Sequence, residues 1–129
     1  FYHGVYFRPQ IGSVMTQCDV ALVPSRFEET YSLVLSELWR AGTPAAVARI
    51  GAMGERLRDG VDGRLFTPDA ADEIESVMEW FLTTDEWRGW KLPSPRLAPE
   101  MAGEYDALYR AALERRPWAP PATSPPHER

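Results

Sequence analysis

The feature that most constrains the fold is a pair of short, purely apolar runs, residues 20–23 (VALV) and 45–48 (AAVA), which alternate with helical patterns. A continuous apolar run of this length is typical of a strand that is buried on both faces, as in a parallel sheet. Residues 1–5 and 64–66 are two further strand candidates. Strands that alternate with helices predict an α/β fold in which helices sandwich a parallel sheet, with right-handed crossovers.

Helical patterns lie between and after these strands. The stretch SLVLSELWRA, which starts at Ser32, places Leu35, Leu38 and Trp39 on one helical face, with Ser32 in position to cap the helix. Gly42 follows as the expected C-terminal cap. Further helices are expected over residues 9–17, from residues 67–69 onward with a stripe of Ile74, Val77, Met78, Phe81 and Leu82, and around Pro99.

Proline content divides the end of the chain. Three prolines within residues 93–99 predict a linker before the last helix. Residues 117–129 contain five prolines and little to bury, which is typical of a disordered tail. With 44% apolar residues for a core, we expect one domain over residues 1–115 and a disordered tail over residues 116–129.

Composition excludes several classes of protein. Acids outnumber bases 19 to 14, and this excess argues against a nucleic-acid binder, which needs a basic surface. No apolar run approaches the roughly 18 residues of a membrane span. Cys18 is the single cysteine and cannot form an internal disulfide, so we interpret it as a small buried residue of an intracellular protein. The expected localisation is cytoplasmic, with peripheral attachment of a longer protein to a membrane left open.

The stretch over residues 24–42 (PSRFEETYSLVLSELWRAG) carries the chemistry. It runs from an apolar strand through an acidic loop into a helix, and ligands of open α/β sheets bind beyond the carboxyl ends of the strands. The backbone N–H groups of Tyr31, Ser32 and Leu33 are expected to be unpaired, next to the positive end of the helix dipole. Such a helix start binds an anion such as a phosphate.

Glu29 and Glu37 flank this helix start and lie eight residues apart. Taken alone, two such acids are more often solvated charges or caps than ligands. A carboxylate in a loop can also accept hydrogen bonds from sugar hydroxyls, and a second one on the helix can hold a vicinal diol such as that of ribose. A ligand that suits this arrangement has hydroxyls at both ends and a phosphate between them, as a nucleotide sugar does.

Five sequence pieces, taken in order, form a fairly specific signature. They are CDVALVPS from Cys18, the pair Glu29 and Glu37, RAGTP from Arg40, IGAMGE from Ile50 and DGVDG from Asp59. Over roughly residues 1–113 the chain resembles the C-terminal, donor-binding domain of the group-1 family of retaining GT-B glycosyltransferases. The resemblance implies a Rossmann-like half of a GT-B fold.

The resemblance also implies a retaining glycosyltransferase of hexosyltransferase type, which moves a sugar from a nucleotide diphosphate sugar to an acceptor hydroxyl without a metal or cofactor. By position, Glu29 is the implied catalytic residue, because it would hold donor-sugar hydroxyls at the reacting centre. The backbone of Tyr31, Ser32 and Leu33 would contact the sugar and phosphates, and Glu37 would bind the ribose. Catalysis would rest largely on electrostatic stabilisation of the departing diphosphate.

The chain departs from the family pattern in ways that affect its expected activity. Ser32 stands where the family usually has glycine, and Thr30 where it often has proline or glycine, so side chains narrow the approach of a sugar to the backbone. In the family, the Arg and Lys that neutralise the diphosphate, and the N-terminal domain, lie upstream of the segment that residues 1–113 resemble. We therefore expect the chain alone to bind donor weakly and to be inactive. We also expect the last helix and some of the tryptophans to pack against that N-terminal domain, the candidates being Trp80, Trp87, Trp90 and Trp118.

Two other functions stay open on the sequence. A sugar-nucleotide epimerase of GT-B architecture would require a different set of acids and a histidine, and a non-catalytic α/β interaction module would not bind nucleotide. Arg49, Arg56, Arg58 and Arg64 are interleaved with acids, which favours a mixed, solvated surface over a clamp for a diphosphate.

Overall fold

A computed structural model describes residues 4, 5 and 7–114. The chain divides into two compact units, Phe1–Pro95 and Arg96–Arg129, and the division falls inside the proline-rich linker that the sequence predicts. The expected tail over residues 116–129 lies outside the described residues, so the domain boundary at residue 115 stays a prediction.

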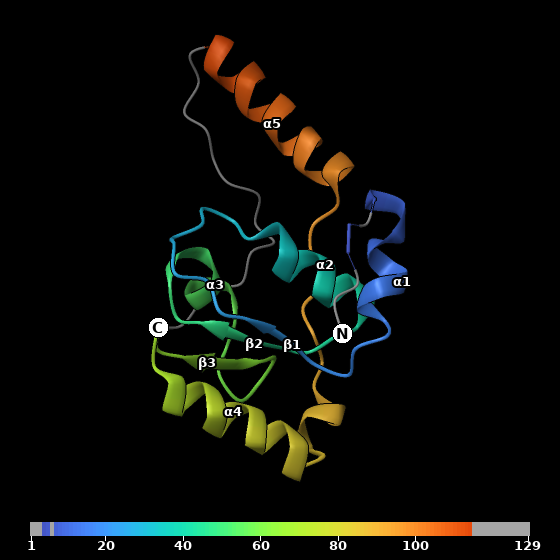
Figure 1. Ribbon diagram of the computed structural model, residues 1–129. Coiled ribbons are helices and arrows are strands. Elements are labelled where there is room, and N and C mark those ends of the chain that lie inside the picture. Colours follow the sequence, from blue (N-terminus) through green and yellow to red (C-terminus); the bar gives the residue numbers. More distant parts are fainter. Residues whose placement is uncertain (1–3, 6, 115–129) are drawn as a thin grey trace. The chain divides into compact units, whose positions relative to one another are not determined.

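A three-stranded parallel sheet forms the centre of the first unit (Figure 1). Its strands are β1 (Ala21–Val23), β2 (Ala45–Ala48) and β3 (Arg64–Phe66), in the spatial order β1-β2-β3. Val23 pairs with Val47, and Val47 also pairs with Leu65 on its other side. The predicted α/β class with a parallel sheet is therefore confirmed.

Helices cover both faces of this sheet (Figure 1). Ala45 and Val47 of β2 pack with α2 (Leu33–Ala41) and α3 (Gly51–Arg56), whereas Ala46 and Ala48 pack with α4 (Ala71–Thr83). This division follows from the strand itself, because successive side chains of a strand point to opposite faces. The unit is completed by η1 (Arg8–Gln10), α1 (Ile11–Met15) and η2 (Glu86–Gly89).

The first strands differ from the expectation. Within the described residues β1 is an edge strand, and Leu22 is 39% exposed, so the strand is not buried on both faces as its apolar run suggested. An edge strand has only one neighbour in the sheet, and Leu22, which pairs with Ala46, lies on the α4 face of the sheet but outside the core cluster of that face. Of the strand expected over residues 1–5, Gly4 and Val5 lie in no strand, and the other residues are outside the described part.

The exit of α2 follows the sequence closely. Leu35, Leu38 and Trp39 are buried as predicted. Gly42 adopts a φ of 77°, and its N–H donates to the Trp39 carbonyl at 3.1 Å while the Thr43 N–H donates to the Leu38 carbonyl at 2.9 Å. These two bonds form a Schellman motif, which needs a left-handed residue and therefore favours glycine. The chain then enters β2 directly.

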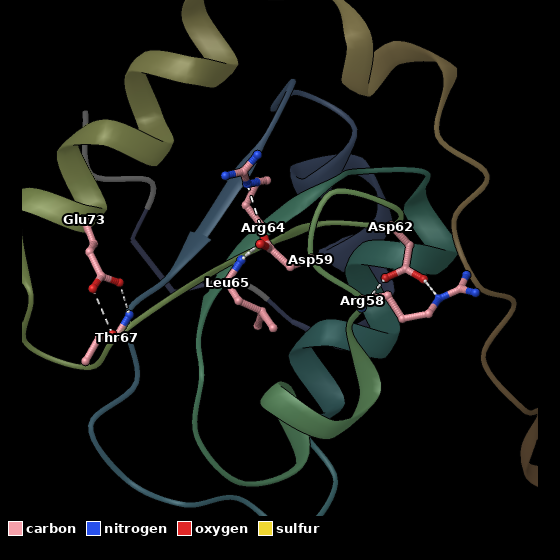
Figure 2. A network of polar contacts seen from close by, with 7 residues as sticks. All are labelled: Arg58, Asp59, Asp62, Arg64, Leu65, Thr67 and Glu73. Carbon is pink, nitrogen blue, oxygen red and sulfur yellow. Dashed lines mark hydrogen bonds and ion pairs between the residues drawn. The ribbon is translucent and has the colours of Figure 1, made fainter. Parts of the chain in front are cut away.

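Two aspartates hold the loop that leads into β3 (Figure 2). The buried carboxylate of Asp62 accepts hydrogen bonds from the backbone N–H and the Nε of Arg58, both at 2.7 Å. Asp59 accepts the backbone N–H of Leu65 at 2.9 Å and forms an ion pair with Arg64 at 3.3 Å. The DGVDG stretch therefore supports the sheet through its own side chains.

The start of α4 lies slightly later than residues 67–69. Asp69 has a left-handed backbone (φ 64°), and the helix begins at Ala71. Glu73 reaches back from the first turn and accepts the backbone N–H of Thr67 at 2.6 Å and its hydroxyl at 3.0 Å (Figure 2). The carboxylate thus fixes the connection between β3 and α4.

The tryptophans after the middle of α4 correct another expectation. Trp87 is buried, and Trp80 and Trp90 stack with ring centroids 5.5 Å apart against the same core cluster. These three rings thus pack against the core of their own unit, whereas Trp118 lies outside the described residues. Leu82, at the edge of the predicted stripe, is 84% exposed and is not part of the core.

In the second unit, α5 (Ala98–Leu113) begins where the sequence predicts, with Pro99 in its first turn. The Glu100 carboxylate accepts the backbone N–H of Leu97 at 3.0 Å and so satisfies a donor at the helix start. No residue of α5 is buried, and the stacked rings of Tyr105 and Tyr109 are exposed.

Candidate functional site

The carboxyl end of β1 leads through residues 24–32 into α2, which begins at Leu33. We call residues 28–32 the α2 entry segment. Its first residues are exposed, Tyr31 is half-buried and Ser32 is buried. Loops beyond the carboxyl ends of parallel strands are where ligands of α/β sheets bind.

Ser32 joins the α2 entry segment to the helix in an uncommon conformation. Its φ of 58° and ψ of 85° are left-handed, whereas a capping serine normally has an extended backbone. Ser32 is the N-cap residue of α2, as the sequence predicts. Its side chain makes no capping hydrogen bond, so the predicted role of the hydroxyl is wrong. The residue is 4% exposed, and its Oγ has no partner among the described residues. Glycine adopts such a positive φ without strain, whereas a serine does not.

The start of α2 leaves backbone donors unused. Among the described residues, no carbonyl or side chain accepts the N–H groups of Tyr31, Ser32 and Leu33, and the first bond into the helix runs from the Ser36 N–H to the Ser32 carbonyl at 3.4 Å. Unpaired N–H groups at the positive end of a helix dipole attract an anion. These donors have no partner in the described part of the chain, and their role in ligand binding stays a prediction.

Glu29 and Glu37 are the two acids of the predicted site. Glu29 is exposed in the α2 entry segment, and Glu37 is half-buried in the second turn of α2. Neither carboxylate forms a hydrogen bond or ion pair with another residue in the described part of the chain. Residues four apart share a helix face, and side chains lean toward the helix N-terminus, so Glu37 lies on the face of Leu33 and leans toward the helix start. Both acids are free to accept hydrogen bonds from hydroxyls.

The α2 entry segment is held by α3, not by its own side chains. The Ala52 N–H donates to the Glu29 carbonyl at 2.9 Å. Gly51 (φ +50°) lies so close that an added Cβ would be 2.9 Å from the same oxygen. Arg56, in the last turn of α3, donates to the last two carbonyl oxygens of the segment. Gly51 and Ala52 thus lie against the backbone of the segment.

The interpretation of the four arginines as one mixed, solvated surface is wrong for Arg56. Its half-buried guanidinium bonds to backbone 24 and 25 residues earlier in the chain. Arg58 and Arg64 do pair with neighbouring acids, and Arg49 is exposed. No local signal distinguishes Arg56, because its partners are brought to it only by the docking of α3 against α2.

A cavity of about 570 Å³ lies at the opposite end of the sheet. Asp19 and Pro44, which precede β1 and β2, line it together with Trp90. It contains none of the predicted site residues, and it lies at the amino end of the strands, away from the end where such folds bind ligands. Cys18 also lines it and is exposed, which corrects its interpretation as a buried residue, because it lies in the turn between α1 and β1.

Neither a metal-ligand cluster nor a membrane-spanning helix occurs in the described part of the chain. Within residues 4, 5 and 7–114, no three His, Cys, Asp or Glu side chains come together as potential metal ligands. No helix in this part of the chain has both the length and the apolar character needed to cross a bilayer. The two histidines of the chain, His3 and His127, lie outside the described part.

Fold and site together define a class of protein. A parallel sheet between helices, with free amides after a strand's carboxyl end, is a Rossmann-like α/β domain. The profile of the family described as "Glycosyl transferases group 1" matches residues 1–84, well over half of the chain. The chain therefore belongs to the group-1 glycosyltransferase family, and the resemblance found in its sequence motifs is confirmed.

Curated relatives carry the same family assignment. The D-inositol 3-phosphate glycosyltransferase of Streptosporangium roseum is 29% identical over 109 residues, which cover 74% of this chain and 25% of the relative. That of Mycobacterium marinum is 30% identical over 115 residues, covering 82% of this chain and 24% of the relative. The chain thus spans about a quarter of the length of these relatives.

Solved structures support the fold assignment. HepE of Anabaena in complex with UDP-glucose shares 28% identity, with a TM-score of 0.57 over 61% of this chain and 22% of that chain. HepE in complex with UDP gives 28% identity and a TM-score of 0.56 over 62% of this chain and 22% of that chain. The predicted Rossmann-like half of a GT-B fold is confirmed.

Proposed function

We propose that this chain is the donor-binding part of a glycosyltransferase that transfers a hexose from a nucleoside diphosphate sugar to an acceptor hydroxyl, with retention of anomeric configuration. One observation carries the proposal: in the stretch that follows the carboxyl end of β1, three unused backbone donors lie, along the chain, between two glutamates whose carboxylates bind no other described residue. The complexes of HepE with UDP-glucose and UDP support a nucleoside diphosphate sugar as the ligand.

Each group at the α2 start has a role in this proposal. The N–H groups of Tyr31, Ser32 and Leu33 hold the sugar and diphosphate, and the helix dipole stabilises the negative charge that grows on the diphosphate as the glycosidic bond breaks. Glu29 accepts hydrogen bonds from donor-sugar hydroxyls at the reacting centre, and Glu37 accepts them from the ribose diol. The acceptor hydroxyl is the nucleophile, and the reaction uses no metal or cofactor.

A second domain completes the site in this proposal. The cations that neutralise the diphosphate come from an Arg and a Lys upstream of the segment that this chain resembles, and the acceptor contacts come from an N-terminal GT-B domain of a longer protein. The family assignment favours this function over a sugar-nucleotide epimerase and over a non-catalytic interaction module.

Thermal unfolding of the full-length protein that contains this chain, in the presence of UDP, tests the proposal. A ligand that binds only the native state raises its stability by mass action, so UDP is expected to raise the melting temperature. Glu37→Ala should abolish this increase, because it removes charged acceptors worth about 1.5–3 kcal/mol, while the melting temperature without UDP stays within about a degree or two.

Glu75→Ala is the matched control, since Glu75 is an exposed glutamate of α4 on the other face of the sheet. It should leave the UDP-induced shift intact. If wild type shows no shift with UDP, or if Glu37→Ala retains the full shift, the proposed binding site is wrong.

A further inference from the structure

The guanidinium of Arg56 joins three parts of the candidate site. Its Nη1 donates to the carbonyl oxygens of Tyr31 and Ser32, the latter at 3.0 Å, and its Nη2 donates to the Ser36 hydroxyl at 2.8 Å. One side chain at the end of α3 therefore contacts the α2 entry segment and the first turn of α2 at once.

Aromatic rings hold this guanidinium in place. The Arg56 Cζ lies 4.1 Å from the ring centroid of Tyr31 and 5.1 Å from that of Trp39. Both distances are within the range of an attractive cation–π interaction. Trp39 belongs to the buried core, so the position of Arg56 is coupled to the packing of α2.

The carbonyls that Arg56 binds determine where the backbone donors point. In a trans peptide the C=O and the following N–H point in opposite directions, and no peptide of the described residues is cis. Bonds to the Tyr31 and Ser32 carbonyls therefore direct the N–H groups of Ser32 and Leu33 away from Arg56. These are two of the three donors of the proposed diphosphate site.

The backbone that is held in this way would otherwise relax. Ser32 is left-handed without being a glycine, a conformation that persists only where the surroundings impose it. Its buried hydroxyl contributes no hydrogen bond that would stabilise this turn. The contacts with Arg56 are the side-chain interactions that hold its carbonyl.

We infer that Arg56 is a positioning residue of the donor site: it does not touch the ligand but orients the amides of Ser32 and Leu33 for the diphosphate. This inference rests on the proposed function. It follows that loss of Arg56 weakens binding of the diphosphate selectively, because the ribose is held by Glu37, whose side chain Arg56 does not contact.

Two probes, UDP and uridine, separate this role from a general structural one. We suggest measuring their dissociation constants for the full-length protein that contains this chain, with wild type, Arg56→Met and Arg56→Lys, well below the melting temperature of each. Arg56→Met is expected to bind UDP about tenfold more weakly and uridine as tightly as wild type does, since only charge-assisted bonds to phosphate are misaligned. Arg56→Lys keeps a hydrogen-bond donor but not the planar guanidinium fork. We expect it to bind UDP about threefold more weakly than wild type does.

Arg64→Met is the matched control. Arg64 is also half-buried, lies 4.8 Å from the ring centroid of Trp80 and pairs with an aspartate, but it belongs to β3. It should bind both probes as wild type does. A general loss of packing would lower the affinities for UDP and uridine alike.

Each result decides between the two proposals. If wild type binds UDP but Arg56→Met binds it equally well, or loses UDP and uridine equally, the positioning role is wrong and the donor site stands. If Arg56→Met does not fold, Arg56→Lys decides by the same criteria. If wild type binds neither probe, the proposed function itself fails.

Discussion

Two acidic loops at this sheet are built in opposite ways. In the loop before β3, Asp59 and Asp62 hold the local backbone with their own carboxylates. In the α2 entry segment, Glu29 and the nearby Glu37 hold nothing, and the backbone is fixed from outside by Gly51, Ala52 and Arg56. In the sequence, both loops are short stretches that contain acids between apolar segments.

The comparison separates acids that support structure from acids that are free for a ligand. A buried carboxylate must receive hydrogen bonds from the protein, since leaving it unsatisfied costs free energy. A ligand-binding carboxylate must keep its acceptor capacity free, and its loop then needs support from another element. The dependence of the α2 entry segment on α3 is therefore consistent with a binding loop.

The largest effect is expected at the contact between α3 and the α2 entry segment. Gly51→Ala should lower the free energy of unfolding by about 3 kcal/mol, because it adds left-handed strain and places a methyl group against backbone. Gly60→Ala is the matched control: its φ is +72° but nothing lies within 4 Å of an added Cβ, so about 1 kcal/mol is expected. Urea unfolding measures both, and equal losses would show that the steric contact does not matter.

A smaller loss is expected for the self-supported loop. Asp62→Ala should lower the free energy of unfolding by about 2 kcal/mol, because it leaves the backbone N–H of Arg58 without its acceptor. Glu29→Ala should change it by less than about 0.5 kcal/mol, since that carboxylate is exposed and unpaired among the described residues. Urea unfolding again provides the values. A loss at Glu29 as large as that at Asp62 would remove the distinction between the two loops.

The effect expected for a glycine at position 32 has the opposite sign. Ser32→Gly should raise the free energy of unfolding by about 1 kcal/mol, because glycine adopts the left-handed conformation without strain. Ser32→Ala keeps that strain and removes only the hydroxyl. It therefore separates the contributions of backbone strain and of the buried hydroxyl to the free energy of unfolding. Thermal unfolding measures the change, and a lower melting temperature for Ser32→Gly would contradict the assigned backbone strain.

Much of the fold could be predicted because the signals are local. The apolar run of β2 and the Leu35, Leu38 and Trp39 stripe of α2 were predicted correctly, and so was Gly42 as the exit of the helix. Period and capping depend on residues a few positions apart, which the sequence shows directly. For the site, the sequence could predict that Glu29 and Glu37 flank a helix start. It could not predict whether their carboxylates bind other residues of the chain.

Three of the incorrect predictions depend on neighbours distant in the sequence. β1 was expected to be covered on both faces, yet an apolar run does not say whether a strand has one neighbour or two. Trp87 was one of the candidates for packing against another domain, yet it packs on the core of its own unit. Arg56 was grouped with solvated arginines because its acceptors lie on another element.

The amino-acid sequence by itself determined the strand and helix segments, the turn at Gly42 and the spacing of Glu29 and Glu37, because these depend on side-chain period and backbone preference over a few residues. Only the tertiary structure decided which acids are engaged, why residue 32 is left-handed and what Arg56 does. Those properties arise when α3 docks against α2 and brings together groups more than twenty residues apart, and no local pattern encodes such a contact.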